Sequence, residues 1–192
     1  MALALRDQQR HNYGAYYGWP EDVRYELIDG LAYIVERAPP RKHQDFLLDV
    51  FRQIADALEG APCRTYVAPF DIRLPRGNET DDDVDTVVQP DISVICDRAK
   101  LDDRGCRGAL EWVIEVLSPS SASHDQILKR AIYERHGVRE FWLIHPVDLI
   151  VTVYRLVDGA YGKPDIHELK DTLACGILPE VVIDWARVVR EA

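Results

Sequence analysis

The chain has 192 residues, of which 47% are hydrophobic and 29% charged, so it is long enough for one domain with a real core. No apolar run reaches the roughly 18 residues of a membrane helix, and the start of the chain lacks the basic and long apolar regions of a signal peptide. The formal net charge of −10 disfavours non-specific binding of nucleic acid, which depends on lysine and arginine at the phosphates.

Two short strands joined by a tight turn are expected first. Residues 24–29 and 31–37 alternate apolar and polar side chains around Asp29-Gly30, and Asp-Gly between such runs is a strong hairpin signal. We expect residues 1–20, which precede this hairpin, to form a frayed N-terminal arm.

A helix is expected over residues 44–59. Leu47, Ile54 and Leu58 recur at helical spacing along one face, and Gly60 marks the end of the helix. This amphipathic pattern indicates a helix that packs one side against a sheet.

Three strands are expected next, at residues 64–68, 70–74 and 87–96. The polar segment 76–85 between the last two predicts a loop. Pro90 lies inside the third strand and removes one N–H donor, which restricts where that strand can pair.

The second half of the chain begins with a strand that is expected to be buried on both faces. Residues 110–117 (LEWVIEVL) are almost all apolar, which is typical of such a strand. A helix from Ser123 or His124 to about His136 follows, and Gly137 ends it.

Residues 140–145 and 149–156 predict two more strands, before a weaker strand pair and a closing helix over 184–190. The order of strands, helix, strands, helix and strands predicts a mixed α/β (α+β) domain over residues 1–192. Its central mixed sheet is flanked by helices. The helices are too few for a regular doubly wound sheet.

The four cysteines stand at positions 63, 96, 106 and 175, with no Cys-x-x-Cys pair and no histidine at ligand spacing. We therefore expect neither a zinc site nor a disulfide framework. Scattered cysteines in a chain of this size favour a reducing cytoplasm.

Glu115 is the most informative residue, because it interrupts the apolar strand WVIEVL. An ionised carboxylate inside a sheet costs free energy unless it is paired or binds a metal. The alternative is a glutamate at the sheet end that reaches water or an arginine.

Asp91 follows Pro90 at the start of the apolar run ISVI, 24 positions before Glu115. That separation is enough for a strand, a loop and an adjacent strand, so the two carboxylates can meet at one point. Such hard oxygen ligands suit Mg²⁺. An aspartate near a strand end is also common without any function.

Asp125, Lys129 and Tyr133 are spaced four residues apart on the second helix and share one face. They can complete a site beside the two acids. An aspartate and a lysine at this spacing are equally an ordinary surface pair worth a few tenths of a kcal/mol.

Two other groups of residues are weaker candidates. The acidic run 79–85 alternates Asp81, Asp83 and Asp85 but lacks the glycine and distal glutamate of a calcium loop, so a solvated loop is expected. His43 is expected at the surface or as a helix cap, with substrate contact left open.

Several motifs in order resemble the Uma-type restriction endonuclease family, which belongs to the PD-(D/E)XK nuclease superfamily. They are YELIDG, FDIRL, VVQPDISVI, WVIEVLSPS, Asp-x-x-x-Lys-x-x-x-Tyr and GVREFWLIHP, which together extend over residues 25–156. The resemblance implies a restriction endonuclease-like fold.

By this resemblance, Asp91 is the first acid of the superfamily, Glu115 the second, and Glu26 an early acidic position of the family. The superfamily usually has a lysine two residues after the second acid, where this chain has Leu117. The family resemblance implies that Lys129, from the following helix, supplies this charge.

The implied activity is metal-dependent hydrolysis of phosphodiester bonds, with DNA as the implied substrate and Mg²⁺ or Mn²⁺ as cofactor. The expected metal ligands are Asp91, Glu115 and the backbone carbonyl of Val116. Lys129 is expected to orient water or stabilise the phosphate, and Glu26 to hold a second metal or position Lys129. Asp125 and Tyr133 are expected to support the site.

Two further hypotheses stay open. One is a catalytically inactive binding module for nucleic acid or protein, which the net charge and Leu117 favour and which predicts that Lys129 points to solvent. The other is a homodimer that pairs the apolar segments 141–143 and 149–154, although burial in one core explains them equally well.

Overall fold

The computed structural model describes residues 5–20, 22–35, 39–119 and 122–191. Its larger sheet has the strand order β12-β11-β10-β9-β6-β3, and β13 also pairs with β11. The bounds of these strands are β3 Arg64–Val67, β6 Ile92–Ile95, β9 Trp112–Val116, β10 Glu140–His145, β11 Ile150–Val157, β12 Ala160–Tyr161 and β13 Asp165–Glu168. Only β9 and β10 pair in parallel within it, so the sheet is mixed, as expected from the sequence.

A smaller sheet has the order β2-β1-β5-β4-β8-β7. Its strands are β1 Tyr25–Ile28, β2 Leu31–Ile34, β4 Ile72–Arg73, β5 Val87–Val88, β7 Leu101–Asp102 and β8 Gly105–Arg107. The predicted hairpin around Asp29-Gly30 is present, with both turn residues at positive φ. Residues 36 and 37 of its second predicted strand lie outside the described residues.

The helices are α1 Tyr13–Tyr17, α2 Arg41–Ala57, α3 Arg130–His136 and α4 Trp185–Glu191. Short 3₁₀ turns span Asp81–Asp83 and Arg98–Lys100, and a π-helical turn, η3, spans His124–Lys129 directly before α3. The last two strands are β14 Thr172–Ala174 and β15 Val182–Asp184. None of the helices in the described ranges is long and apolar enough to span a bilayer.

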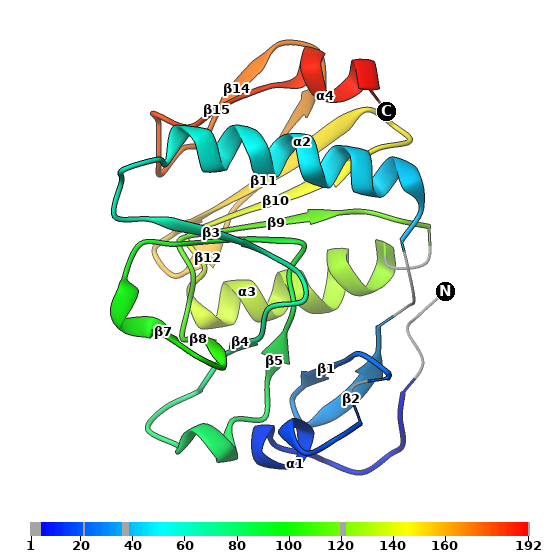
Figure 1. Cartoon of the computed structure of the whole chain (residues 1–192), viewed down its shortest axis with the longest axis vertical. Helices are drawn as coiled ribbons and strands as arrows, with labels where there is room; N and C mark the ends of the chain where they lie inside the picture. The colour runs from blue at the N-terminus through cyan, green and yellow to red at the C-terminus, as the bar shows by residue number, and fades with distance from the viewer. Residues whose placement is uncertain (1–4, 21, 36–38, 120–121, 192) are drawn as a thin grey trace.

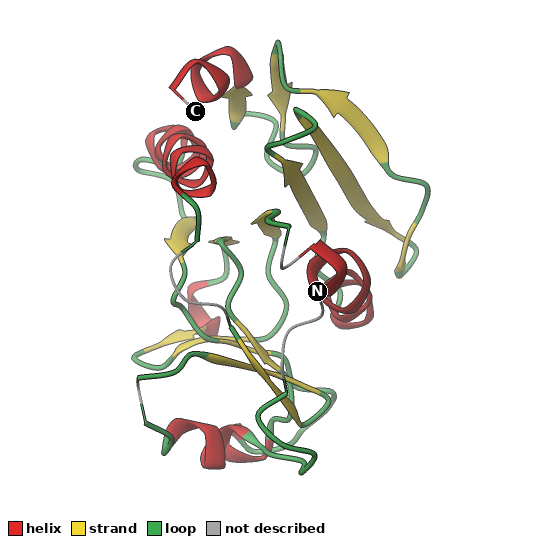
Figure 2. Ribbon diagram, turned by 90° about the vertical axis from the view of Figure 1, so that its right-hand side faces the viewer, coloured by secondary structure: helices red, strands yellow, loops and turns green. Residues whose placement is uncertain are grey.

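Helices α2 and α3 lie on opposite faces of the larger sheet (Figures 1 and 2). Trp112 and Ile114 of β9 pack in the same cluster as α2, whereas Val113 packs in the cluster of α3. Successive side chains of a strand point to opposite faces, so Glu115 shares the α3 face with Val113. This alternation directs Glu115 toward the helix that carries Lys129.

The predicted elements near the site are present with adjusted ends. The first long helix begins at Arg41 and ends at Ala57, rather than covering 44–59. The strand predicted at 87–96 is divided at Pro90 into β5 and β6, which belong to different sheets. Pro90 therefore lies where the chain crosses from one sheet to the other.

Residues 5–20 of the expected N-terminal arm are packed against the smaller sheet rather than frayed. The N–H of Arg6 donates to the Ala32 carbonyl, the N–H of His11 donates to the Gly30 carbonyl, and Tyr13 is fully buried. Residues 1–4 lie outside the described residues.

The cysteine expectation was wrong in one respect, because Cys63 and Cys96 form a disulfide. The antiparallel register of β3 and β6 pairs Arg64 with Ile95, so the next residues outward, Cys63 and Cys96, are brought together from 33 positions apart. The expectation of a reducing cytoplasm depended on unpaired cysteines and loses that support.

Of the two segments considered for a dimer interface, residues 141–143 are internal, whereas Leu149 of the second is 38% exposed. Phe141, Trp142 and Leu143 are at most 1% exposed, and β10 lies between β9 and β11. The alternative explanation, burial in one core, accounts for these apolar residues.

Candidate active site

Asp91 and Glu115 face each other across two antiparallel strands. The register pairs Ile92 with Ile114, so Asp91 lies opposite Glu115 one step further along. The Asp91 N–H donates to Glu115 Oε2 over 3.3 Å, and the Val116 N–H donates to Asp91 Oδ2 over 2.8 Å. The two predicted acids therefore lie side by side where β6 begins and β9 ends.

The backbone of Val116 also borders the two acids, through its N–H. The same register places Val116 opposite Pro90, and Val116 already directs its N–H toward Asp91. Proline has no N–H, so Pro90 cannot donate to the Val116 carbonyl as an ordinary strand residue would. The Pro-Asp pair thus removes one backbone donor next to the two carboxylates.

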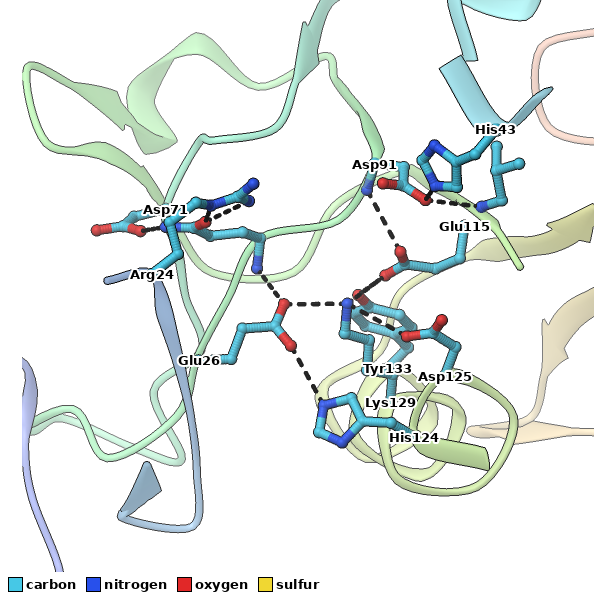
Figure 3. A network of polar contacts seen from close by, with 12 residues as sticks. Arg24, Glu26, His43, Asp71, Asp91, Glu115, His124, Asp125, Lys129 and Tyr133 are labelled. Atoms are coloured by element: carbon cyan, nitrogen blue, oxygen red, sulfur yellow. Dashed lines mark hydrogen bonds and ion pairs between the residues drawn. The ribbon is translucent and has the colours of Figure 1, made fainter. Parts of the chain in front are cut away.

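Lys129 lies between carboxylates from two different sheets. Its Nζ is 3.0 Å from Glu115 Oε1, 3.0 Å from Glu26 Oε1 and 3.4 Å from Asp125 Oδ1. The lysine is only 5% exposed, so it is not the surface partner of Asp125 that the spacing also allowed. Figure 3 shows these groups as one continuous polar network.

The π-helical turn η3 aligns His124 with Lys129. His124 Nε2 is 3.2 Å from Glu26 Oε2, while Lys129 contacts the other oxygen of the same carboxylate. In an α-helix, residues five apart differ by about 140° around the axis and cannot share a partner easily. The wider π turn brings both side chains to Glu26, and such turns are frequent at functional sites.

Tyr133 completes the pocket around Glu115. Its hydroxyl donates to Glu115 Oε1 over 2.7 Å, and its side chain is fully buried. Burial, together with the negative charges of Asp125, Asp91 and Glu26, raises the pKa of Glu115 well above its ordinary value, against the opposing effect of Lys129.

For Lys129 and Glu26, the neighbouring charges instead favour the ionised form of each group. Burial alone would lower the pKa of Lys129, but Glu115, Glu26 and Asp125 raise it well above its ordinary value. Burial opposes ionisation of Glu26, yet Lys129 and His124 lower its pKa to about 2. The lysine is therefore cationic and Glu26 anionic at neutral pH.

The site carries more negative charge than its lysine balances. Glu26, Asp91, Glu115 and Asp125 gather around the single ammonium of Lys129. The described residues contain no group of three or more His, Cys, Asp or Glu side chains placed to hold a metal on their own. Two carboxylates and one carbonyl, with water as the remaining ligands, are the donor set that Mg²⁺ uses most readily. The residues present therefore fit a divalent cation.

Two histidines belong to this network, His43, for which substrate contact was left open, and His124, which was not predicted. His43, in the first turn of α2, places Nε2 3.1 Å from Asp91 Oδ2, and its side chain is 9% exposed rather than at the surface. His124 holds Glu26 and is 2% exposed. Each contact joins elements far apart in sequence, which spacing alone cannot reveal.

The acidic run 79–85 does not join the site. Asp81 is bound by Arg73 and Arg107, and Asp83 accepts a hydrogen bond from Thr80. Arg73 is fully buried, so this segment is anchored to the smaller sheet rather than simply solvated.

Comparison with known proteins places this geometry in context. Residues 13–186 match a family model described as Uma2, "Putative restriction endonuclease". The structure resembles a crystal structure described as a putative nuclease belonging to DUF820 from Anabaena variabilis ATCC 29413. The TM-score is 0.70 and the identity 20%, over 93% of this chain and 97% of that chain. At this identity the likeness shows the fold. The search of curated proteins gave no match.

Proposed function

Because the chain belongs to the Uma2 family of putative restriction endonucleases, we propose that it is a metal-dependent endonuclease that hydrolyses phosphodiester bonds in DNA. Asp91 and Glu115 are the central acids, and Lys129 is the catalytic cation. The observation that carries the proposal is the 3.0 Å contact between Lys129 Nζ and Glu115 Oε1.

That contact bears on the missing lysine two residues after Glu115, where this chain has Leu117. The superfamily pattern has a lysine two positions after the second acid, and here an ammonium reaches the same carboxylate from the next helix. An inactive binding module would leave Lys129 pointing to solvent, yet this side chain is buried and contacts three carboxylates.

Asp91, Glu115 and the Val116 carbonyl would hold Mg²⁺ or Mn²⁺. When bound, such an ion polarises a phosphate oxygen and lowers the pKa of a coordinated water. The chain contributes the fixed position of these oxygens, since the hydrogen bond from the Val116 N–H sets the Asp91 carboxylate.

The charge of Lys129 stabilises the negative charge that develops on the phosphate during attack. Glu26 and Asp125 hold the ammonium in place, and His124 holds Glu26. Tyr133 keeps the Glu115 carboxylate oriented through its hydroxyl. These residues position the reacting groups rather than react themselves.

A plasmid-nicking assay with Mg²⁺ or Mn²⁺ tests this proposal. Asp91→Asn is expected to abolish nicking, whereas Asp158→Asn, the same change of charge in the turn between β11 and β12, is expected to leave it intact. Crystals soaked with Mn²⁺ are expected to give anomalous density between Asp91 and Glu115. Nicking that is equal in wild type and Asp91→Asn would contradict the proposed site.

A further inference from the structure

A second pocket lies beside the proposed active site and has a different chemistry. It has a volume of about 350 Å³, at the lower end of the roughly 300–1,000 Å³ of ligand pockets. Its lining includes Tyr16, Tyr17, Phe70, Asp71, Gln89 and Arg104. Aromatic rings and hydrogen-bonding groups are thus combined in one small hollow.

Gln89 connects this pocket to the acids. Its backbone N–H donates to Glu26 Oε1 over 2.7 Å, and its side chain lines the pocket two residues before Asp91. On the other side, the Ala68 N–H donates to the Asp91 carbonyl, and Phe70 follows two residues later. Figure 3 shows Asp71 at one end of the network and Asp91 and His43 at the other. The pocket is therefore linked to the acids through Gln89 and Glu26, at the opposite end of the network from Asp91.

The aromatic residues of the pocket each contact a neighbouring side chain. Phe70 stacks on Tyr66 with the ring planes only 4° apart, and the Tyr16 hydroxyl donates to Asp71. The Arg104 guanidinium lies 4.6 Å from the centroid of the Tyr17 ring. Rings of this kind bind the faces of unpaired nucleobases by stacking.

Asp71 is the group that can read a base edge. The Gln89 amide and the Tyr16 hydroxyl both donate to its Oδ1, at 2.8 Å and 3.1 Å, so they fix the carboxylate from one side. Burial raises the pKa of Asp71 above its ordinary value, against these two hydrogen bonds. A ligand with N–H donors would compensate this carboxylate.

We infer that this pocket binds an unpaired guanine of the nucleic-acid strand that is cleaved, with Asp71 accepting from its Watson–Crick edge. Guanine presents two adjacent N–H donors there, N1–H and the N2 amine, whereas each other base presents one. This inference rests on the proposed function, and it names the substrate feature that the enzyme selects.

Equilibrium binding of fluorescent five-nucleotide single strands tests it, with Ca²⁺ in place of the catalytic metal. We expect an oligothymidine with one central guanine to bind at least about tenfold more tightly than all-thymidine, since guanine adds a hydrogen bond to the charged carboxylate. Replacing guanine by hypoxanthine, which lacks the N2 amine, is expected to remove part of this preference.

Two variants and a control distinguish a loss of guanine recognition from a loss of the folded state. Asp71→Asn is expected to bring the two strands within about twofold, and Phe70→Leu to weaken both strands while the preference remains. Asp158→Asn should behave as wild type. Thermal unfolding checks that each variant is folded. Equal affinity of wild type for both strands, no binding of either, or an unchanged preference in Asp71→Asn would overturn the inference.

The outcome is distinguishable from that of the nuclease proposal. Binding does not require cleavage, so a guanine preference without plasmid nicking would retain the pocket and reject the activity. Nicking without any base preference would retain the activity and reject the pocket.

Discussion

Lys129 Nζ lies 3.0 Å from Glu115 Oε1, although the two residues are 14 positions apart and belong to a helical turn and a strand. The same ammonium also contacts Glu26 and Asp125. This one cation therefore joins both sheets of the molecule, since Glu26 lies in β1 and Glu115 in β9.

Lys129→Met is expected to lower the free energy of unfolding by about 3–5 kcal/mol, because it leaves buried carboxylates without their partner. Urea unfolding measures this loss. Lys170→Met is the matched control, since Lys170 pairs with Glu168 on the surface, where solvent screens the ion pair and little stability is lost. Equal losses in the two variants would contradict the arrangement around Lys129.

His43→Ala is expected to reduce nicking by about 10–100-fold, the usual effect of removing a residue that orients a metal ligand. The reason is the 3.1 Å contact between His43 Nε2 and Asp91 Oδ2. Initial rates at saturating Mn²⁺, together with the Mn²⁺ concentration for half-maximal activity, measure the effect. A rate and a metal requirement both equal to those of wild type would remove His43 from the site.

Asp29 links acid stability to the hairpin turn. The hydrogen bond from Arg135, aided by the charges of Arg135 and Arg76 and opposed by burial, lowers the pKa of Asp29 below its ordinary value of 3.8. The folded state therefore gains stability from ionised Asp29 above pH 3.8, and this gain is lost as pH falls through the lower folded pKa.

The expected consequence is that Asp29→Asn lowers the melting temperature at pH 7 and converges with wild type near the acid limit. Asn tolerates the positive φ of 51° at this position, so the backbone is not the cause. Asp158→Asn, also at φ 51°, controls for the substitution in this conformation. A difference that stays constant with pH would contradict the role of the charge.

The Cys63–Cys96 disulfide is expected to stabilise the chain by about 2–4 kcal/mol, because it closes a long loop in the unfolded state. Unfolding by urea with and without dithiothreitol measures the difference. The double variant Cys63→Ser, Cys96→Ser is expected to have the unfolding free energy of reduced wild type, with or without dithiothreitol. If dithiothreitol does not change the unfolding free energy of wild type either, the disulfide contributes nothing to stability.

Much of the fold follows from local patterns in the sequence. The run LEWVIEVL predicts a strand buried on both faces, and β9 is such a strand. Asp29-Gly30 predicts the hairpin, and both residues have the required positive φ. These features depend on neighbouring residues alone, so the sequence is sufficient for them.

The proximity of Asp91 and Glu115 could be predicted from the sequence for a similar reason. Both acids interrupt or border apolar strands, and 24 positions allow two strands to be adjacent. The roles of His43 and His124 were not predictable, since His43 meets Asp91 from 48 positions away and His124 meets Glu26 from 98. Such contacts depend on how helices pack on the sheet.

The disulfide could not be predicted from the sequence, for a different reason. Cys63 and Cys96 are paired by the register of β3 on β6, and a shift of one residue would separate them. Cysteine spacing holds no information about that register. The sequence criterion of paired Cys-x-x-Cys motifs therefore does not apply to a bond across two strands.

The π-helical turn η3 allows one residue to be lost between His124 and Lys129 without separating their side chains. Ile127 in this turn is 64% exposed, so many replacements there should be harmless. Deleting it would leave His124 and Lys129 four residues apart in an α-helix, about 40° around the axis, so the two side chains would still share one face. The turn is therefore equivalent to one residue inserted into an α-helix that would present both side chains to Glu26 without it.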